Sequence, residues 1–214
     1  MDAVFIPIKE RSERVPGKNF RTLGERPLYQ FIIINCLSAA CFDDVYVDTN
    51  SAKVATYAKE MGCKIIDRDP ELATADANGN DLLVRHAEMF PQYSYYFQAF
   101  ATAPFLLATT IRACVDTLHI RQGIDSVLTA IQRPGWFWCN GQPVNYYPGV
   151  LPRSQDAVQV VQETTGFYGI KAAALKRYKC RIGARPEFRM VSEREAFDID
   201  SEEDFALAEK IIAL

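Results

Sequence analysis

Cationic side chains gather close behind the first apolar segment of this 214-residue chain. A strand is predicted over residues 3–8, and the loop after it carries Lys9, Arg11, Arg14 and Lys18. Pro16 and Gly17 can bend such a loop around an anion. Because Arg and Lys donate charge-assisted hydrogen bonds, several of them together suit a triphosphate. The stretch therefore predicts a phosphate-binding loop, although a solvated surface turn can have the same composition. No Walker lysine motif or Gly-x-Gly-x-x-Gly sequence occurs in the chain.

Two acidic side chains, Asp198 and Asp200, stand two residues apart near the other end of the chain. In an extended segment, residues at this spacing point to the same side, so both carboxylates can reach one point. Mg²⁺ takes hard oxygen ligands and completes its shell with water and phosphate oxygens. The pair therefore predicts a magnesium site. The alternative is that Asp200 caps the last helix while Asp198 is solvated.

Alternating strand and helix patterns position these residues. Strands are predicted over residues 3–8, 44–48, 64–66, 95–99, 126–131 and 166–171, and helices over 28–40, 51–61, 80–90, 108–121 and 201–214, with a short helix from Ala172. Ser51 and Ser201 are the expected N-caps of two of these helices. Such alternation predicts parallel strands joined by helices in a three-layer α/β/α Rossmann-like sheet. Ligands bind at the carboxyl ends of such strands, so the loop after residue 8 and segments 48–50, 67–76 and 101–105 should surround one crevice.

The pattern breaks between about residues 133 and 161, where aromatic residues, prolines and glycines alternate without a helical period. We interpret this stretch as a β-hairpin arm inserted in a single domain that covers residues 1–214. Aromatic residues that a small domain cannot bury usually pack on a partner, so we expect a homodimer. A satellite core under a long loop is the alternative.

Composition limits the function further. The net charge of −3 argues against a nucleic-acid partner. The six cysteines show no metal-ligand spacing and are expected to be small buried hydrophobic residues in a reducing cytoplasm. The longest uncharged run, residues 31–42, is too short to span a membrane, and the start of the chain leaves no room for a signal peptide. We therefore expect a soluble cytoplasmic protein without a membrane partner.

Residues 6–19 resemble the N-terminal signature I-P-A-R-x-G-S-K-x-I-P-x-K-N of the cytidylyltransferases that activate sialic acid and related nonulosonic or octulosonic acids. Four residues coincide with it in register: Ser12, Pro16, Lys18 and Asn19. Lys9 stands where that family has Arg, and Glu10 and Arg11 depart from its pattern. The acid pair and the acidic helix after it are also similar to the end of that family. The resemblance implies a nucleotidyltransferase-type fold and Mg²⁺ on Asp198 and Asp200.

Further matches follow in the same order over nearly the whole chain. Segment 68–73 resembles R-P-x-E-L-A, segment 101–105 resembles P-T-S-P-L, segment 153–156 resembles R-R-Q-D, and segment 163–168 resembles E-N-G-A-F-Y. Phe100 replaces the glutamine that normally precedes the second of these, and Gln98, one strand repeat earlier, could take its place. Thr164 and Thr165 replace the Asn-Gly of the last. The resemblance implies substrate contacts for Ser12, Asn19, Arg68, Asn80, Gln98, Thr102, Arg153, Gln155 and Thr165. For Arg68 the alternative is a surface pair with Asp69 or Glu71, and for Asn80 it is a helix cap.

The resemblance implies that a hydroxyl group of an acidic sugar attacks the α-phosphate of CTP, with Lys9, Arg14 and Lys18 as catalytic cations. No residue stands out as the general base, and His86 and His119 are expected to be ordinary helical residues. Two alternatives stay open: a nucleotidyltransferase for another sugar or sugar phosphate, and a non-catalytic nucleotide-binding relative. The departures from the family pattern that keep the non-catalytic alternative open are Glu10, Arg11, Phe100, Thr164 and Thr165.

Overall fold

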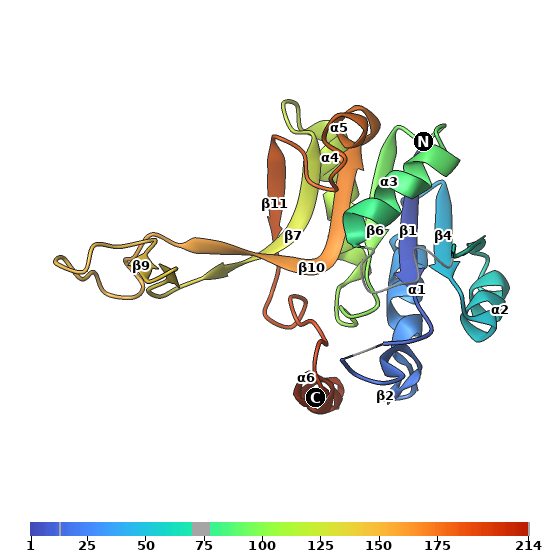
Figure 1. Cartoon of the computed structure of the whole chain (residues 1–214), viewed down its shortest axis with the longest axis horizontal. Coiled ribbons are helices and arrows are strands. Elements are labelled where there is room, and N and C mark those ends of the chain that lie inside the picture. Colours follow the sequence, from blue (N-terminus) through green and yellow to red (C-terminus); the bar gives the residue numbers. More distant parts are fainter. Residues whose placement is uncertain (13, 70–77, 214) are drawn as a thin grey trace.

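A seven-stranded sheet forms the centre of the protein, in a computed structural model that describes residues 1–12, 14–69 and 78–213 (Figure 1). The strands, in spatial order, are β11 (Pro186–Met190), β7 (Ser126–Arg133), β10 (Val160–Lys171), β6 (Tyr95–Ala99), β1 (Asp2–Ile8), β4 (Asp44–Thr49) and β5 (Lys64–Asp67). Strands β1, β4, β5 and β6 are parallel, and β11 is parallel to β7. The central strands are buried on both faces, as expected of a parallel α/β sheet.

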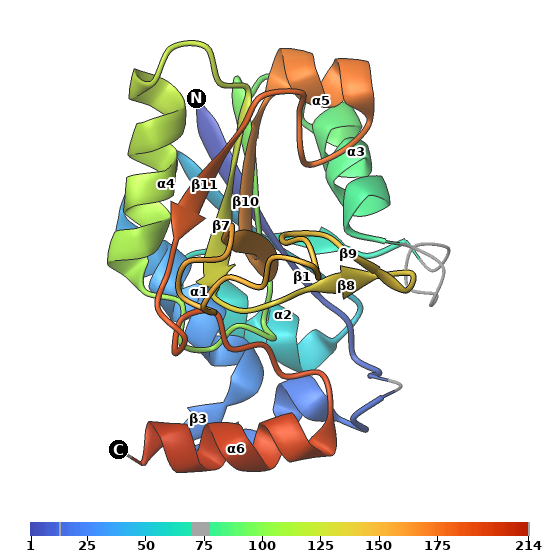
Figure 2. The same ribbon diagram turned by 90° about the vertical axis from the view of Figure 1, so that its left-hand side faces the viewer.

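Helices cover both faces of this sheet (Figure 2). One face packs against α1 (Leu28–Ala39), α2 (Ala52–Glu60) and α4 (Ala108–Ile120), and the other packs against α3 (Gly79–Met89) and α5 (Ala172–Tyr178). The last helix, α6 (Glu202–Ile212), lies apart from these layers beyond the carboxyl end of β1 and forms a third apolar cluster with the short hairpin of β2 (Thr22–Leu23) and β3 (Arg26–Pro27). The three-layer arrangement predicted from the sequence is thereby confirmed.

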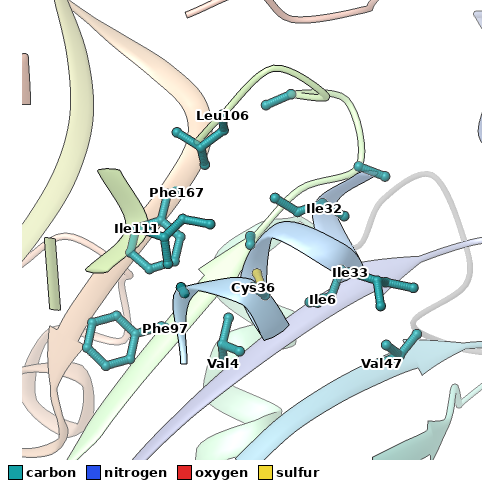
Figure 3. Close-up of a cluster of buried hydrophobic side chains, with 14 of the residues drawn as sticks. Val4, Ile6, Ile32, Ile33, Cys36, Val47, Phe97, Leu106, Ile111 and Phe167 are labelled. Carbon is teal, nitrogen blue, oxygen red and sulfur yellow. The ribbon is translucent and has the colours of Figure 1, made fainter. Parts of the chain in front are cut away.

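Strand β1 shows how the core is divided between the two faces. Val4, Ile6 and Ile8 lie in the cluster under α1, whereas Ala3 and Phe5 lie in the cluster under α3. Figure 3 shows Val4 and Ile6 beside Ile32, Ile33 and Cys36 of α1, with Phe97 and Phe167 from neighbouring strands. Because alternate residues of a strand point to opposite faces, this one apolar run fills both halves of the core.

Two features of the sheet differ from the prediction. The strand predicted over residues 166–171 begins at Val160 and runs antiparallel to both of its neighbours, with an irregularity between Glu163 and Tyr168. It returns from β7 through a hairpin, which reverses the chain without a helical crossover. The edge strand β11 was not predicted. Apolar and charged residues alternate in it, but the run is short, begins with proline and is mostly exposed, and its pairing with β7 decides its conformation.

The hairpin between β7 and β10 extends away from the sheet as an arm (residues 133–161; Figure 1). Inside it are the short strands β8 (Trp138–Cys139) and β9 (Gln142–Pro143). Buried Asn145 fixes its conformation, since its side chain accepts a hydrogen bond from the Phe137 backbone and donates to the carbonyl groups of Gly135 and Val158. The arm also exposes large apolar side chains, among them Trp136, Trp138, Tyr147, Val150, Leu151 and Val158. The predicted β-hairpin arm is therefore present.

Cysteine burial agrees only partly with the prediction. Cys36, Cys63 and Cys114 are buried, but Cys139 is exposed because it lies on the arm. All six cysteines are free thiols, and the part of the chain that the structure describes holds no cluster of three or more metal-ligating side chains. Within those same residues, no helix has both the length and the apolar character needed to cross a membrane.

Candidate active site

The N-terminal cation loop (residues 9–19) leaves β1 at its carboxyl end and turns sharply at Gly17. This residue has φ 66°, a left-handed conformation that favours glycine. Backbone hydrogen bonds from Lys18 to Val15 and from Phe20 to Gly17 close a short 3₁₀ turn, and buried Val15 anchors it. Asn19 donates from its amide to the Lys9 carbonyl over 2.9 Å. These contacts direct the Lys18 side chain inward, where it is buried.

The acidic segment (residues 198–200) approaches the same place from the far end of the chain. Ile199 is fully buried, and its backbone donates a hydrogen bond of 2.9 Å to the Thr102 carbonyl behind β6. Ser201 then caps α6 in a capping box with Asp204. Because Ser201 is the cap, Asp200 does not have that role.

The cation loop and the acidic segment meet. Asp200 Oδ1 lies 2.9 Å from Arg14 Nη2 and 3.7 Å from Lys18 Nζ. The Lys18 ammonium group also donates a short hydrogen bond to the Ile199 carbonyl. Burial lowers the pKa of Lys18 from its usual value, while Asp200 and Asp198 act in the opposite direction. Two regions that are distant in the sequence thus share one charged centre.

Asp198 lies deeper in this centre. Its Oδ2 accepts a hydrogen bond of 2.6 Å from Thr165, and its Oδ1 is buried without a hydrogen-bond partner among the described residues. Burial raises the pKa of Asp198, although hydroxyl groups of Thr102 and Thr165 oppose this effect, and the negative charge of Asp200 adds to it. A buried carboxylate oxygen without a donor, next to a second carboxylate, is a donor set that suits a divalent cation.

A cavity of about 450 Å³ opens over this centre, a size typical of small-ligand sites. It is lined by most of the predicted site residues: Lys9, Ser12, Arg14, Lys18, Asn19, Arg68, Thr102, Thr165, Asp198 and Asp200. The crevice expected at the carboxyl ends of the strands is therefore present, although segment 48–50 does not line it and Asp48 only holds Arg68 there. Of segment 67–76, residues 70–76 lie outside the described part of the chain.

Arg68 lines the cavity and is held in place by a buried hydrogen-bond network. Its Nε donates to Asp48 Oδ1 over 2.9 Å, and its Nη2 donates to the Asp48 carbonyl. The other carboxylate oxygen of Asp48 lies 2.8 Å from His86 Nε2, and the His86 ring stacks on Phe5. Burial raises the pKa of Asp48, but hydrogen bonds and charges from His86 and Arg68 outweigh this effect and lower it. His86 is therefore a buried partner of Asp48, and an ion pair with Asp48 orients Arg68, in contrast to the surface pair considered above.

Asn80 and Gln98 stand behind the cavity wall. The Asn80 side chain accepts a hydrogen bond from the Arg181 backbone, and Asn78 is the residue that caps α3. Gln98 is fully buried and donates from Nε2 to the Gly79 carbonyl over 2.9 Å. Both residues therefore shape the wall near Gly79 and do not line the cavity.

Arg153 and Gln155 are not brought to the cavity of their own chain. Both are exposed on the arm, and Arg153 pairs with Asp156 over 2.5 Å. The expected contact of Arg153 with an acidic sugar is thus not formed within one chain, because the arm extends away from the sheet (Figure 1).

Arg181 is a cavity residue that the sequence reasoning missed. It lies in the loop between α5 and β11, which has no periodic pattern. Its guanidinium group packs 3.7 Å from the centre of the Tyr168 ring and 5.4 Å from that of Phe100. Only its charge could have indicated a functional role.

A cationic loop after the first strand, facing a carboxylate pair across one cavity of a Rossmann-like sheet, defines a site of the nucleotidyltransferase class. A model of the cytidylyltransferase family matches residues 3–133, and the chain belongs to this family of nucleotidyltransferase enzymes. The resemblance to synthetases of CMP-sialic acid type is confirmed by relatives named below.

N-acylneuraminate cytidylyltransferase A of Danio rerio is 26% identical over 97% of the chain. The chain spans only 50% of that relative's length. CMP-N,N'-diacetyllegionaminic acid synthase of Legionella pneumophila is also 26% identical, and the match covers 98% of this chain and 95% of the relative. A solved CMP:2-keto-3-deoxy-manno-octonic acid synthetase complexed with CTP has the same fold, with a TM-score of 0.75, 16% identity, and coverage of 99% of this chain and 98% of the other.

Proposed function

We propose that the protein transfers CMP from CTP to a sialic-acid-like nonulosonic or octulosonic sugar acid and releases pyrophosphate. The observation that carries this proposal is the meeting of Arg14 and Lys18 with Asp200, and of Asp198 beside them, in one cavity. The names of its relatives in Danio rerio and Legionella pneumophila support a sugar acid as the acceptor class.

In the proposed reaction a hydroxyl oxygen of the sugar forms a bond to the α-phosphorus of CTP, and the bond from that phosphorus to the bridging oxygen of the β-phosphate breaks. The electron pair of the broken bond leaves with pyrophosphate, and the hydroxyl proton passes to solvent or a base. Lys9, Arg14 and Lys18 neutralise the charge that spreads over the phosphates. Ser12 and Asn19 belong to the same loop and line the cavity, so they can add neutral hydrogen-bond donors.

We infer that Mg²⁺ is the cofactor, held by Asp198 and Asp200 together with phosphate oxygens. When bound, it supplies Lewis-acid stabilisation of the phosphate charge. The buried free oxygen of Asp198 supports this assignment. Asp200 would exchange part of its ion pair with Arg14 and Lys18 for the cation, which releases both side chains to contact phosphate.

The test is pyrophosphate release from CTP and Mg²⁺ with a panel of 2-keto-3-deoxy sugar acids, repeated with UTP, GTP and ATP and with sugar phosphates as acceptors. We expect release that requires a sugar acid, prefers CTP and stops when EDTA removes the metal. Release that depends on a sugar phosphate would indicate the wrong acceptor class. CTP binding without turnover of any acceptor would indicate a non-catalytic relative.

We further propose that the arm mediates a homodimer, because its exposed apolar side chains need a partner surface. Tyr147 and Val150, which pair across a tight turn of the arm, are 83% and 79% exposed. Replacing both with Glu is expected to weaken the dimer more than tenfold, since charge then replaces apolar contact. Light scattering coupled to size-exclusion chromatography measures the mass over a dilution series. Ile120→Glu is a matched control, because Ile120 is also 79% exposed but lies on α4. A wild-type monomer at micromolar concentration would contradict the proposal.

A further inference from the structure

Arg181 is held at the cavity by elements different from those that hold the N-terminal cations. Its Nη2 donates to the Tyr168 hydroxyl over 3.0 Å and lies 3.4 Å from Glu163 Oε1. Its guanidinium group covers Tyr168 of β10 and lies near Phe100, and its backbone donates to Asn80 of α3. Arg14 and Lys18, in contrast, are held by the acidic segment. The cavity therefore has two separately supported cationic groups.

The Arg181 guanidinium group keeps donors for a ligand. Both of its hydrogen bonds to described side chains come from Nη2, so Nε and Nη1 have no such partner within the described part of the chain. Tyr168 does not neutralise the charge of Arg181. Burial raises the pKa of the Tyr168 phenol, so this group stays protonated and uncharged at neutral pH. Glu163 is exposed and is the single carboxylate in contact with Arg181 among the described residues. Nε–H and Nη1 point to different edges of the guanidinium group, so they are two separate charge-assisted donor sites. The two N–H groups of Nη1 suit an oxygen of a carboxylate.

Gly79 leaves the space that this guanidinium group occupies. A Cβ atom at position 79 would lie 2.4 Å from Arg181 Nη1 and 3.3 Å from the Phe100 ring. Any larger residue would therefore displace the arginine from its place. Phe100 itself stands where the resembled family has glutamine. Arg181 therefore supplies hydrogen-bond donors to a part of the cavity wall where the family's glutamine amide is absent.

These contacts lead to one assignment, which rests on the function proposed above. We propose that Arg181 binds the carboxylate of the sugar acid and thereby determines acceptor specificity, while the N-terminal cations hold the triphosphate. Arg153, the cation expected in this role from the sequence, lies on the arm and is paired with Asp156.

The experiment measures KM for an accepted sugar acid, for its neutral carboxamide and for CTP. In Arg181→Gln we expect KM for the acid to rise about tenfold to a hundredfold, as the loss of a charge-assisted pair predicts, and KM for CTP to stay within twofold. KM for the carboxamide should change little, so the preference for the acid disappears. Arg181→Lys keeps the charge but not the planar guanidinium group, so its KM for the acid should lie between those of the wild type and Arg181→Gln. Arg185→Gln, an exposed charge change in the same loop, is the matched control.

Gly79→Ala gives a second variant that leaves Arg181 in the chain. Because the atom it would displace is the far end of a flexible side chain, the fold should persist while KM for the acid rises in the same direction. An unchanged KM for the acid in both variants would overturn the assignment, as would equal rises for acid and carboxamide. A large effect of Arg153→Gln with none from Arg181→Gln would transfer the role to the arm. A wild-type protein that turns over no sugar acid would instead overturn the proposed function, and this assignment with it.

Discussion

Asp198→Asn is expected to lower kcat by about a hundredfold or more, because it removes one of the two carboxylates that would hold Mg²⁺ beside the triphosphate. Oδ1 of Asp198 is buried and has no hydrogen-bond partner among the described residues, which leaves this oxygen available to the metal. Turnover is measured as pyrophosphate release over a magnesium titration. We expect the variant to need more Mg²⁺ and to stay below the wild-type rate at saturation.

A measurement of thermal stability distinguishes the loss of a metal ligand in Asp198→Asn from unfolding of the variant. Burial raises the pKa of Asp198, which means that its ionised form costs folding free energy at neutral pH. Asparagine lacks that charge and can still accept the hydrogen bond from Thr165, so Tm should not fall. Glu203→Gln is the matched control, since Glu203 is an exposed acid three residues beyond Asp200 and does not line the cavity. Full activity in Asp198→Asn at low Mg²⁺ would contradict the metal assignment.

Local patterns predicted most of the sheet because its central strands are apolar on both faces and its helices follow them in regular alternation. The helix ends agree to within a residue or two, as at α1 and α4, where no side chain caps the first turn and the helical pattern of apolar residues itself marks the ends. The direction of β10 depends instead on the hairpin that returns from β7, and β11 depends on its partner strand. The residues of one strand do not determine which strand it pairs with or in which direction.

The site likewise contains features that follow from local sequence and features that depend on long-range contacts. The cation loop and the acid pair were predictable because each is a compact cluster of charge with a recognisable spacing. Arg181 lies 101 residues from its partner Asn80, and His86 lies 38 residues from Asp48. Such contacts arise only when the sheet brings separate loops together. The partner of Arg68 was missed for the same reason, since Asp48 belongs to another strand end.

Lys18→Met is expected to lower kcat/KM for CTP by at least about tenfold, since it removes a buried cation from the triphosphate half of the cavity. Methionine keeps the length and the apolar stem of lysine, so the turn at Gly17 and its backbone hydrogen bonds should persist. Burial already lowers the pKa of Lys18, and a neutral side chain avoids that desolvation cost. The variant does lose the hydrogen bond to the Ile199 carbonyl, which ties the acidic segment to the loop.

Arg11→Met supplies the comparison for Lys18. Arg11 lies in the same loop and the substitution changes the charge equally, but Arg11 is exposed and does not line the cavity. We expect its kinetics with CTP to match the wild type within twofold, while both variants melt within a few degrees of it. If the two variants lose activity equally, the loop acts through its overall charge, and the inward placement of Lys18 has no special role. If Lys18→Met alone is impaired, the short turn that buries Lys18 against the acidic segment is what gives this cation its effect.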